Sequence, residues 1–231
     1  MMINLDKTIL FYLWGFPINQ TIFYTWIVMA LLVAMSVYIS RKIKNTIEVS
    51  RFQTALEMIV MGMRTQVHEV SNDNPAKYLP LICTFFLFIG LSNLLTIIPI
   101  FQAPTASLST TVAFALCVFV AIPYYGIRNA GIKGYLKKYI EPVPVMLPMN
   151  IVSDITSIFS LAVRLYGNVL GGAVIGSVLI SFVPFLLPLP LQILGLVTGT
   201  IQAYIFALLA IIYISATAPQ IPYIDTKYTS V

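Results

Sequence analysis

Arg164 is the residue of this sequence whose type and position most clearly suggest chemistry. It lies in a long apolar segment, and the only acid of that segment, Asp154, comes ten residues earlier, which is about 15 Å along a helix. A guanidinium keeps its charge in a protein, and an ionisable group inside a membrane segment is functional by default. We therefore expect Arg164 to face water or a carboxylate of another chain. The alternative is a side chain that reaches the membrane interface or bonds backbone carbonyls.

Two amides are expected to lie beside this arginine. Asn168 follows it by four residues, on the same helical face. Gln202 lies in a later apolar segment, and a chain folded back near residue 183 brings it to the level of Arg164. The three side chains would form a polar cluster at one membrane depth. Taken singly, each amide could instead join two neighbouring helices.

Glycines crowd the same segments at spacings that let helices approach closely. Three pairs are separated by three residues, namely Gly167 and Gly171, Gly172 and Gly176, and Gly195 and Gly199. Such pairs allow tight helix packing in membranes. Packing within this chain and docking of a partner's helices remain equally open interpretations.

Composition restricts the environment of these residues. Hydrophobic residues make up 59% of the 231 residues and charged residues 9%, whereas soluble domains carry about 25% charged residues. This excludes a soluble enzyme, a disordered chain and a nucleic-acid-binding domain. The net charge of +5 reflects few acids, and one histidine and two cysteines form no motif with metal-ligand spacing. We expect no metal site, no cofactor and no nucleic-acid partner.

The elements that must position the cluster are membrane helices. Three segments have the required length of about 20 apolar residues: residues 22–40, then residues 79–99 and 108–127, which form a spanning hairpin over 78–127. Residues 48–70 mix charged and apolar positions and predict an amphipathic helix on the membrane surface. The charges also cluster: basic residues at 41–51 and 128–138 are separated by two spans, which predicts a shared cytoplasmic side.

Residues 145–218 predict two long helices that meet in a proline-rich turn at 183–190. Each would measure about 45 Å, more than the roughly 30 Å of a bilayer core, so both must tilt, bend or break. The sequence thus predicts one all-α integral membrane domain over residues 1–231. It has about five membrane helices, three spanning and two long and steeply tilted in a hairpin, plus one surface helix.

Residues 160–168, Ser-Leu-Ala-Val-Arg-Leu-Tyr-Gly-Asn, resemble the S-L-x-x-R-L-F/Y-G-N signature of subunit a of F-type rotary ATP synthases. Residues 199–206 resemble the family's second signature, around a glutamine. Residues 88–93 and 134–142 look most similar to the cyanobacterial and chloroplast branch. The likeness covers nearly the whole chain.

The resemblance implies a non-catalytic stator subunit with two ion half-channels beside a ring of c subunits. Each c subunit carries a carboxylate that an ion neutralises during rotation. By this likeness Arg164 separates the half-channels, and Asn168 and Gln202 lie beside it. The implied partners are the c ring, b-type peripheral-stalk subunits, the rest of the synthase and membrane lipid. The implied location is a bacterial plasma membrane or, alternatively, a thylakoid membrane.

The sequence departs from the family at several acidic positions. Ala173 and Ser107 stand where many members carry an acid, and Ser153 stands where the cyanobacterial pattern has Glu beside Asp154. We therefore expect Asp154 to take part in ion translocation. Hydroxyl groups are expected to line a water path in place of the missing acids: Ser153, Ser157, Ser160, Ser177 and Ser107.

The coupling ion stays open between a proton, which family frequency favours, and Na⁺, which needs oxygen ligands but no relay acids. A stand-alone secondary transporter is a remote alternative, because such proteins show internal repeats and this chain shows none. A structural subunit of a respiratory complex would leave the polar cluster unexplained.

Overall fold

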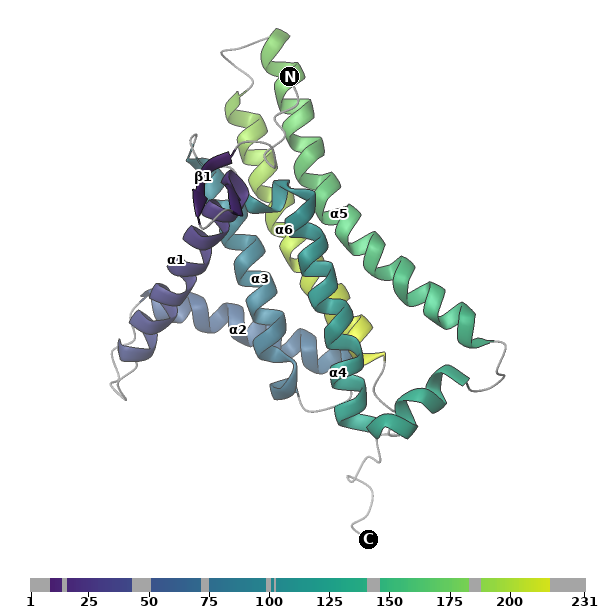
Figure 1. Ribbon diagram of the computed structural model, residues 1–231. Coiled ribbons are helices and arrows are strands. Elements are labelled where there is room, and N and C mark those ends of the chain that lie inside the picture. The colour runs from purple at the N-terminus through teal and green to yellow at the C-terminus, as the bar shows by residue number, and fades with distance from the viewer. Residues whose placement is uncertain are drawn as a thin grey trace.

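The computed structural model describes residues 9–13, 16–42, 51–71, 75–98, 101, 103–140, 146–182 and 188–216. These residues form six α-helices and one short β-hairpin (Figure 1). The helices are α1 (Gln20–Lys42), α2 (Arg51–Val70), α3 (Leu79–Leu94), α4 (Leu108–Ile140), α5 (Met146–Phe182) and α6 (Pro188–Ser215). Short 3₁₀ turns, η2 (Pro75–Lys77), η3 (Leu95–Ile97) and η4 (Pro104–Ala106), flank α3 and precede α4.

Five of these helices, all except α2, are long and apolar enough to cross a membrane. The chain is therefore a multi-pass, all-α integral membrane protein, as the sequence predicted. The helix α1 covers the predicted stretch 22–40, and α2 lies in 48–70. The α3–α4 hairpin lies in 78–127, with α4 extending beyond it, and the α5–α6 pair lies in 145–218. The turn between α5 and α6 lies outside the described residues at 183–187, and α6 begins at Pro188. Its prolines at 188 and 190 fall in the first turn, where a missing N–H costs little.

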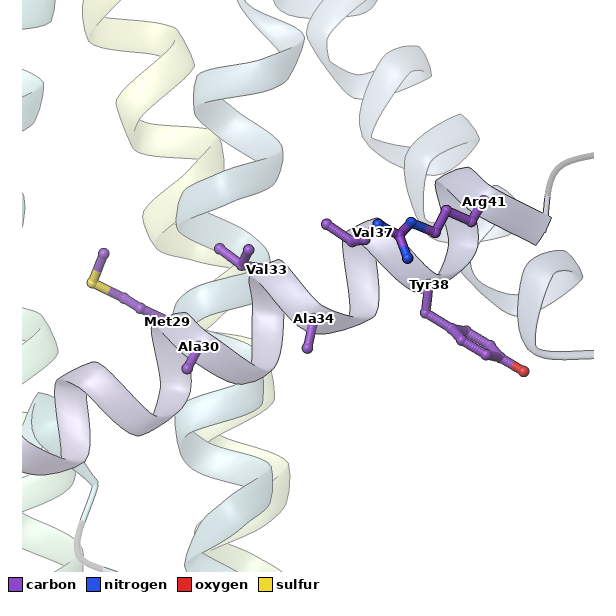
Figure 2. A pocket seen from close by; sticks show the side chains of 7 residues that line it. All are labelled: Met29, Ala30, Val33, Ala34, Val37, Tyr38 and Arg41. Carbon is purple, nitrogen blue, oxygen red and sulfur yellow. The ribbon is translucent and has the colours of Figure 1, made fainter.

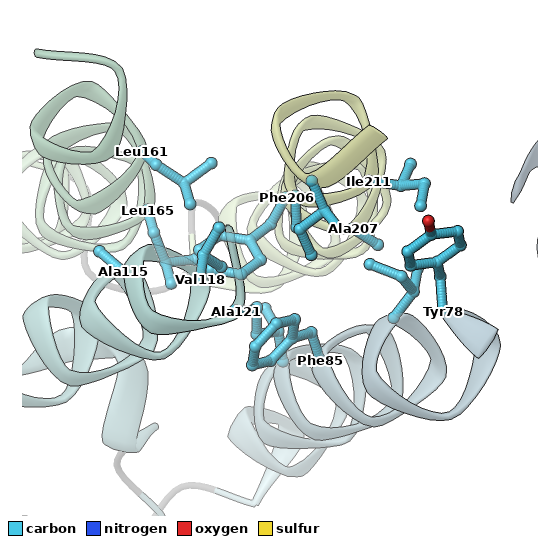
Figure 3. Packing of buried hydrophobic residues seen from close by; sticks show 14 of the residues in the cluster. Tyr78, Phe85, Ala115, Val118, Ala121, Leu161, Leu165, Phe206, Ala207 and Ile211 are labelled. Carbon is cyan, nitrogen blue, oxygen red and sulfur yellow. The ribbon is translucent and has the colours of Figure 1, made fainter. Parts of the chain in front are cut away.

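The helices α3 and α6 form the centre of the bundle, and α4 and α5 pack beside them. In the most apolar stretch of α6, 39% of the residues are buried, whereas in that of α1 only 11% are buried. Phe85 of α3 and Phe206 of α6 meet edge to face, with ring centroids 5.6 Å apart. Leu161 and Leu165 of α5 approach Ala115 and Val118 of α4 in the same core, as Figure 3 shows. In a membrane this packing itself holds helices together, because lipid is as apolar as the side chains.

The helix α4 is longer than its apolar stretch of residues 108–127 predicts. It passes Pro123 and continues to Ile140, with a break at Gly131, where φ is +70°. Glycine adopts this left-handed conformation without steric cost. Before the break, Asn129 donates to the Tyr78 hydroxyl and Lys77 Nζ donates to Asn129 Oδ1 at 3.5 Å. The segment after α4's apolar part is thus fastened to the start of α3.

The helix α2 lies across the lower end of the bundle (Figure 1). Met63 and Val67 are buried on one side of it, whereas Met58, Met61 and other residues of its opposite side are exposed. Ser215 Oγ at the end of α6 donates to Val70 O at 3.2 Å. The ends of α1 and α4 that follow their apolar stretches lie at this same lower end. The described parts of the two basic regions, Arg41 and Lys42 at the end of α1 and residues 128–138 of α4, therefore lie at one end of the molecule.

The β-hairpin was not predicted from the sequence. It pairs β1 (Ile9–Leu13) with β2 (Phe16–Asn19) in antiparallel register, with Leu13 opposite Phe16. β1 consists of aromatic and branched aliphatic residues, which favour extended backbone. β2 leads directly into α1, so the hairpin adds a small cap at the upper end of that helix and leaves the all-α class unchanged.

Candidate functional site

The unbroken helix α5 collects polar residues on one face. Counted from Arg164, the residues at spacings of 4, 7 and 11 before it and 4 after it share this face. They are Ser160, Ser157, Ser153 and Asn168. Arg164 and Ser153 are exposed, and the other three are half-buried. The polar face therefore borders the surface of the chain that lipid or a partner would cover.

One hydrogen bond fixes the register between α5 and α6. Asn168 Nδ2 donates to Thr198 O at 3.3 Å. Arg164 lies four residues before Asn168 on α5, and Gln202 lies four residues after Thr198 on α6. Because the two helices are antiparallel, both steps run in the same direction, and each stays on the same helix face. These two side chains therefore lie at one level, in agreement with the folding point expected near residue 183.

Arg164 and Gln202 differ sharply in their surroundings. Gln202 is 7% exposed, and its Nε2 has no hydrogen-bond partner among the residues described. Arg164 is exposed, and within the same described ranges it forms no ion pair or hydrogen bond. Asp154 is half-buried, ten residues away on the same continuous helix. Among the residues that the structure describes, the guanidinium therefore has no partner of opposite charge.

The structure divides the five expected hydroxyl groups into two sets. Ser153, Ser157 and Ser160 lie on the polar face of α5, toward its lower end. Ser177 lies thirteen residues beyond Arg164, well off that face, and its Oγ donates to Val174 O at 2.8 Å. Ser107 is buried between η4 and α4. Both members of the second set belong to the upper end of the bundle.

The glycines also divide into two groups. Gly167, Gly171, Gly172, Gly176 and Gly195 have open space where a Cβ would lie. At Gly199 a Cβ would lie 2.8 Å from Cγ of Asn93, whose Nδ2 donates to Gly199 O at 2.9 Å. Only the last glycine of the three pairs is therefore needed for a close contact inside the described chain.

Asn93 is a residue that sequence reasoning did not single out for this site. It is buried, and it joins α3 to α6 one turn from Gln202. The neighbouring Ser92 is also buried, and its hydroxyl has no partner within the described segments. Both belong to residues 88–93, a segment that had served only to place the sequence among related ones.

The model of the ATP synthase A chain family matches residues 22–215. This stretch contains α1 from its third residue, all of α3, α4, α5 and α6, and the polar face of α5. The chain belongs to this family. Membership argues against a stand-alone transporter.

Several relatives share about half of their residues with this family member. It is 50% identical to ATP synthase subunit a 2 of Acaryochloris marina over 92% of this chain and 91% of the relative. It is 48% identical to ATP synthase subunit a 1 of Chlorobaculum parvum over 94% and 96%. It is 46% identical to ATP synthase subunit a of Albidiferax ferrireducens over 90% of each chain. These names support a membrane component of ATP synthase and give no support to the sodium alternative.

Proposed function

We propose that this chain is the non-catalytic, proton-translocating subunit a of an F-type ATP synthase and that Arg164 separates its two half-channels. The observation that carries the proposal is the exposed guanidinium on the polar face of α5, level with Gln202 and without a partner among the described residues. A permanent charge in that position needs a counter-charge from another chain. A carboxylate on a rotating ring of c subunits meets this requirement.

The electrostatics of such a pair account for the coupling. A nearby guanidinium lowers the pKa of a carboxyl and so promotes release of its proton. At 4 Å and an effective dielectric constant of 20 the attraction is about 4 kcal/mol. The same charge repels a cation that would cross directly between the half-channels, and about 1.4 kcal/mol suffices for a tenfold change in leak. One arginine is therefore enough to prevent a short circuit.

The two sets of hydroxyl groups suggest where the half-channels run. Ser153, Ser157 and Ser160 continue the polar face from Arg164 toward the lower end, where Asp154 and the basic regions also lie. Because basic loops favour the cytoplasmic side, we assign this path and Asp154 to the cytoplasmic half-channel. Asn168 and Gln202, with Ser107 and Ser177 at the upper end, belong to the outer half-channel.

Two exposed surfaces suit the two kinds of membrane partner. The face of α5 that carries Arg164 also holds Gly167 and Gly171, which leave room for a neighbouring helix, and we assign it to the c ring. A groove of about 860 Å³ follows the weakly packed α1 and suits helices of the b-type peripheral stalk. Figure 2 shows the side chains that line it, namely Met29, Ala30, Val33, Ala34, Val37, Tyr38 and Arg41.

The bacterial relatives favour a bacterial plasma membrane and protons as the coupling ion. The test uses the whole complex in sealed liposomes, with ATP added outside. Wild type should acidify the interior, and Arg164→Ala should abolish acidification while the complex remains assembled. Val163→Ala, at an exposed apolar neighbour, is the matched control and should pump normally.

Unchanged pumping by Arg164→Ala would refute the gating role. Uptake of sodium in place of protons, insensitive to a protonophore, would refute the ion assignment while leaving the gating role intact.

A further inference from the structure

The outer side of α4 carries a row of exposed residues that ends in a positive charge. Leu116, Val120 and Tyr124 are each more than half exposed, and Arg128 follows at the same spacing and is also exposed. Residues four apart form a continuous row along the surface of a helix. We call these four residues the α4 row. Its first members lie in the apolar stretch of α4, and Arg128 comes directly after this stretch ends.

The α4 row has the length of one leaflet of a membrane. Twelve residues separate Leu116 from Arg128, which is about 18 Å along a helix. Half of a hydrocarbon core measures about 15 Å, so the row extends from the acyl chains to the headgroups. At its polar end Arg128 Nη1 donates to Tyr124 Oη at 3.4 Å. A guanidinium has five N–H donors, so this bond leaves most of them available.

A sharp bend after Arg128 keeps a second base near the same level. α4 breaks at Gly131, and a Cβ on Gly134 would lie only 3.1 Å from Cβ of Ala130. In a straight helix the corresponding distance is about 5–6 Å. Beyond the break the segment runs sideways from the lower end of the bundle (Figure 1). Lys133, which is exposed, is the second residue of this segment.

The segment beyond the break has an apolar side of its own. Ile132 is 65% exposed and Leu136 is 52% exposed, and residues four apart share a helix face. Lys133 comes next to Ile132 in the sequence and adds a charge beside this face. Helices with this pattern lie flat in the membrane interface, with the apolar side in lipid. This arrangement holds Lys133 at the depth of the headgroups.

The two bases of this corner lack a negative charge nearby in the chain. The helices α3 and α4 contain no Asp or Glu. Within the part of the chain that the structure describes, neither Arg128 nor Lys133 forms an ion pair. The surface helix α2, at the same lower end, instead mixes Glu57 and Glu69 with its bases. The corner of α4 therefore suits an anion from outside this chain.

We propose that the α4 row and Lys133 bind an anionic phospholipid of the adjoining leaflet. Its acyl chain follows Leu116 and Val120, and its phosphate group is bound by Arg128 and Lys133. A free phosphate ion would leave the apolar part of the row unused, whereas a zwitterionic lipid would bring a second, positive charge to the two bases. Each Lys or Arg near an anionic surface strengthens binding about fivefold. This site goes beyond the proposed function and uses neither the polar face of α5 nor the groove along α1.

Photolabelling with lipid probes tests the site in the whole complex. Proteoliposomes of phosphatidylcholine receive a trace of phosphatidylglycerol or of phosphatidylcholine, each with the same diazirine-bearing acyl chain. Mass spectrometry then compares the labelling of residues 116–127 with that of residues 22–29 on the exposed surface of α1. We expect the anionic probe to label the α4 row at least threefold more than the zwitterionic probe. Equal labelling by the two probes would overturn the proposal.

Charge variants test whether the two bases cause this preference. Arg128→Gln combined with Lys133→Gln should abolish it, whereas Arg128→Lys keeps the charge and should retain it. Arg64→Gln is the matched control, because it removes an exposed base of α2 at the same lower end, and it should also retain the preference. A preference that survives the double substitution would refute the role of Arg128 and Lys133.

The wild-type comparison of the two probes requires no substitution and serves if the double variant fails to assemble. Crosslinking of residues 116–127 to another protein, without labelling by either lipid, would overturn the proposal in favour of a protein partner. A failure of the gating role of Arg164 would leave the preference for the anionic probe unchanged, so the two proposals can fail separately.

Discussion

At the scale of single residues, the site combines a charge that faces out with an amide that faces in. Arg164 is exposed on the polar face of α5, and Gln202 of α6 is buried at the same level. A charged group in lipid without a partner is costly, by at least about 2.5 kcal/mol on insertion scales. Arg164, the residue proposed to separate the half-channels, therefore lacks a counter-charge among the described residues.

Asp154 gives a prediction at this scale. The substitution Asp154→Asn keeps the shape of the side chain and removes the only acid that the sequence supplies to the two long helices. We expect ATP-driven proton uptake to slow several-fold, because the cytoplasmic path loses its titratable group, with no rise in passive leak. Ile155→Ala, at an exposed apolar neighbour, should transport normally. Wild-type rates in Asp154→Asn would make its role structural.

The sequence was informative about single residues where chemistry is unusual and less so where it depends on packing. The cost of an intramembrane arginine marks Arg164, and helical spacing places Asn168 beside it without any coordinates. The inward orientation of Gln202 depends on how α3 and α4 surround α6, which no local pattern encodes. The same holds for the contact of Asn93 with Gly199, because it joins residues 106 positions apart.

At the scale of elements, the contact between α3 and α6 determines where Gln202 lies. The two helices approach closely at Gly199, where the amide of Asn93 bonds the glycine's carbonyl oxygen. Gly90 lies near Ala203 in the same interface, at 4.0 Å for a Cβ built on the glycine. This interface holds the buried side of α6, which carries Gln202, against α3.

Adding one methyl group tests this contact. Gly199→Ala places a Cβ 2.8 Å from Asn93 Cγ, so the amide must move and its buried hydrogen bond is lost. We expect a loss of about 1–3 kcal/mol in stability, seen as a lower thermal midpoint of the purified complex. Gly195→Ala adds the same methyl group to open space one turn earlier and should leave the midpoint unchanged. Equal midpoints for the two variants would contradict this role of Gly199.

Helix ends were harder to predict than helices. The apolar run of residues 108–127 predicted a span that ends at Ile127, shortly after Pro123, whereas α4 continues to Ile140 and breaks only at Gly131. A proline inside a membrane helix is tolerated when neighbours satisfy the freed backbone groups. The β-hairpin before α1 was missed because its short aromatic strands carry no turn signal strong enough to separate them from an apolar helix start.

At the scale of the whole molecule, charge and helix direction give one orientation in the membrane. The basic ends of α1 and α4 and the surface helix α2 lie at the lower end, and the β-hairpin lies at the upper end. By the positive-inside rule we expect the lower end to be cytoplasmic.

Sided labelling checks this orientation with two exposed positions at opposite ends of α4. In intact cells a membrane-impermeant maleimide should react with Ser109→Cys and not with Lys133→Cys, and inverted vesicles should show the reverse. Both proteins need Cys83 and Cys117 replaced so that only the new thiol reacts. Reaction of both positions from the same side would contradict the topology.

The length of α5 has a consequence for the order of events during rotation. Its 37 residues measure about 55 Å, and Figure 1 shows the helix leaning away from the bundle. A rod of that length within a layer of about 30 Å covers more distance sideways than in depth. Under the proposed function, a group carried sideways past α5 would draw level with Ser153, Arg164 and Asn168 one after another, and the opposite direction of travel would reverse their order. The order in which these residues are passed is therefore set by their positions along α5 and requires no movement of this chain.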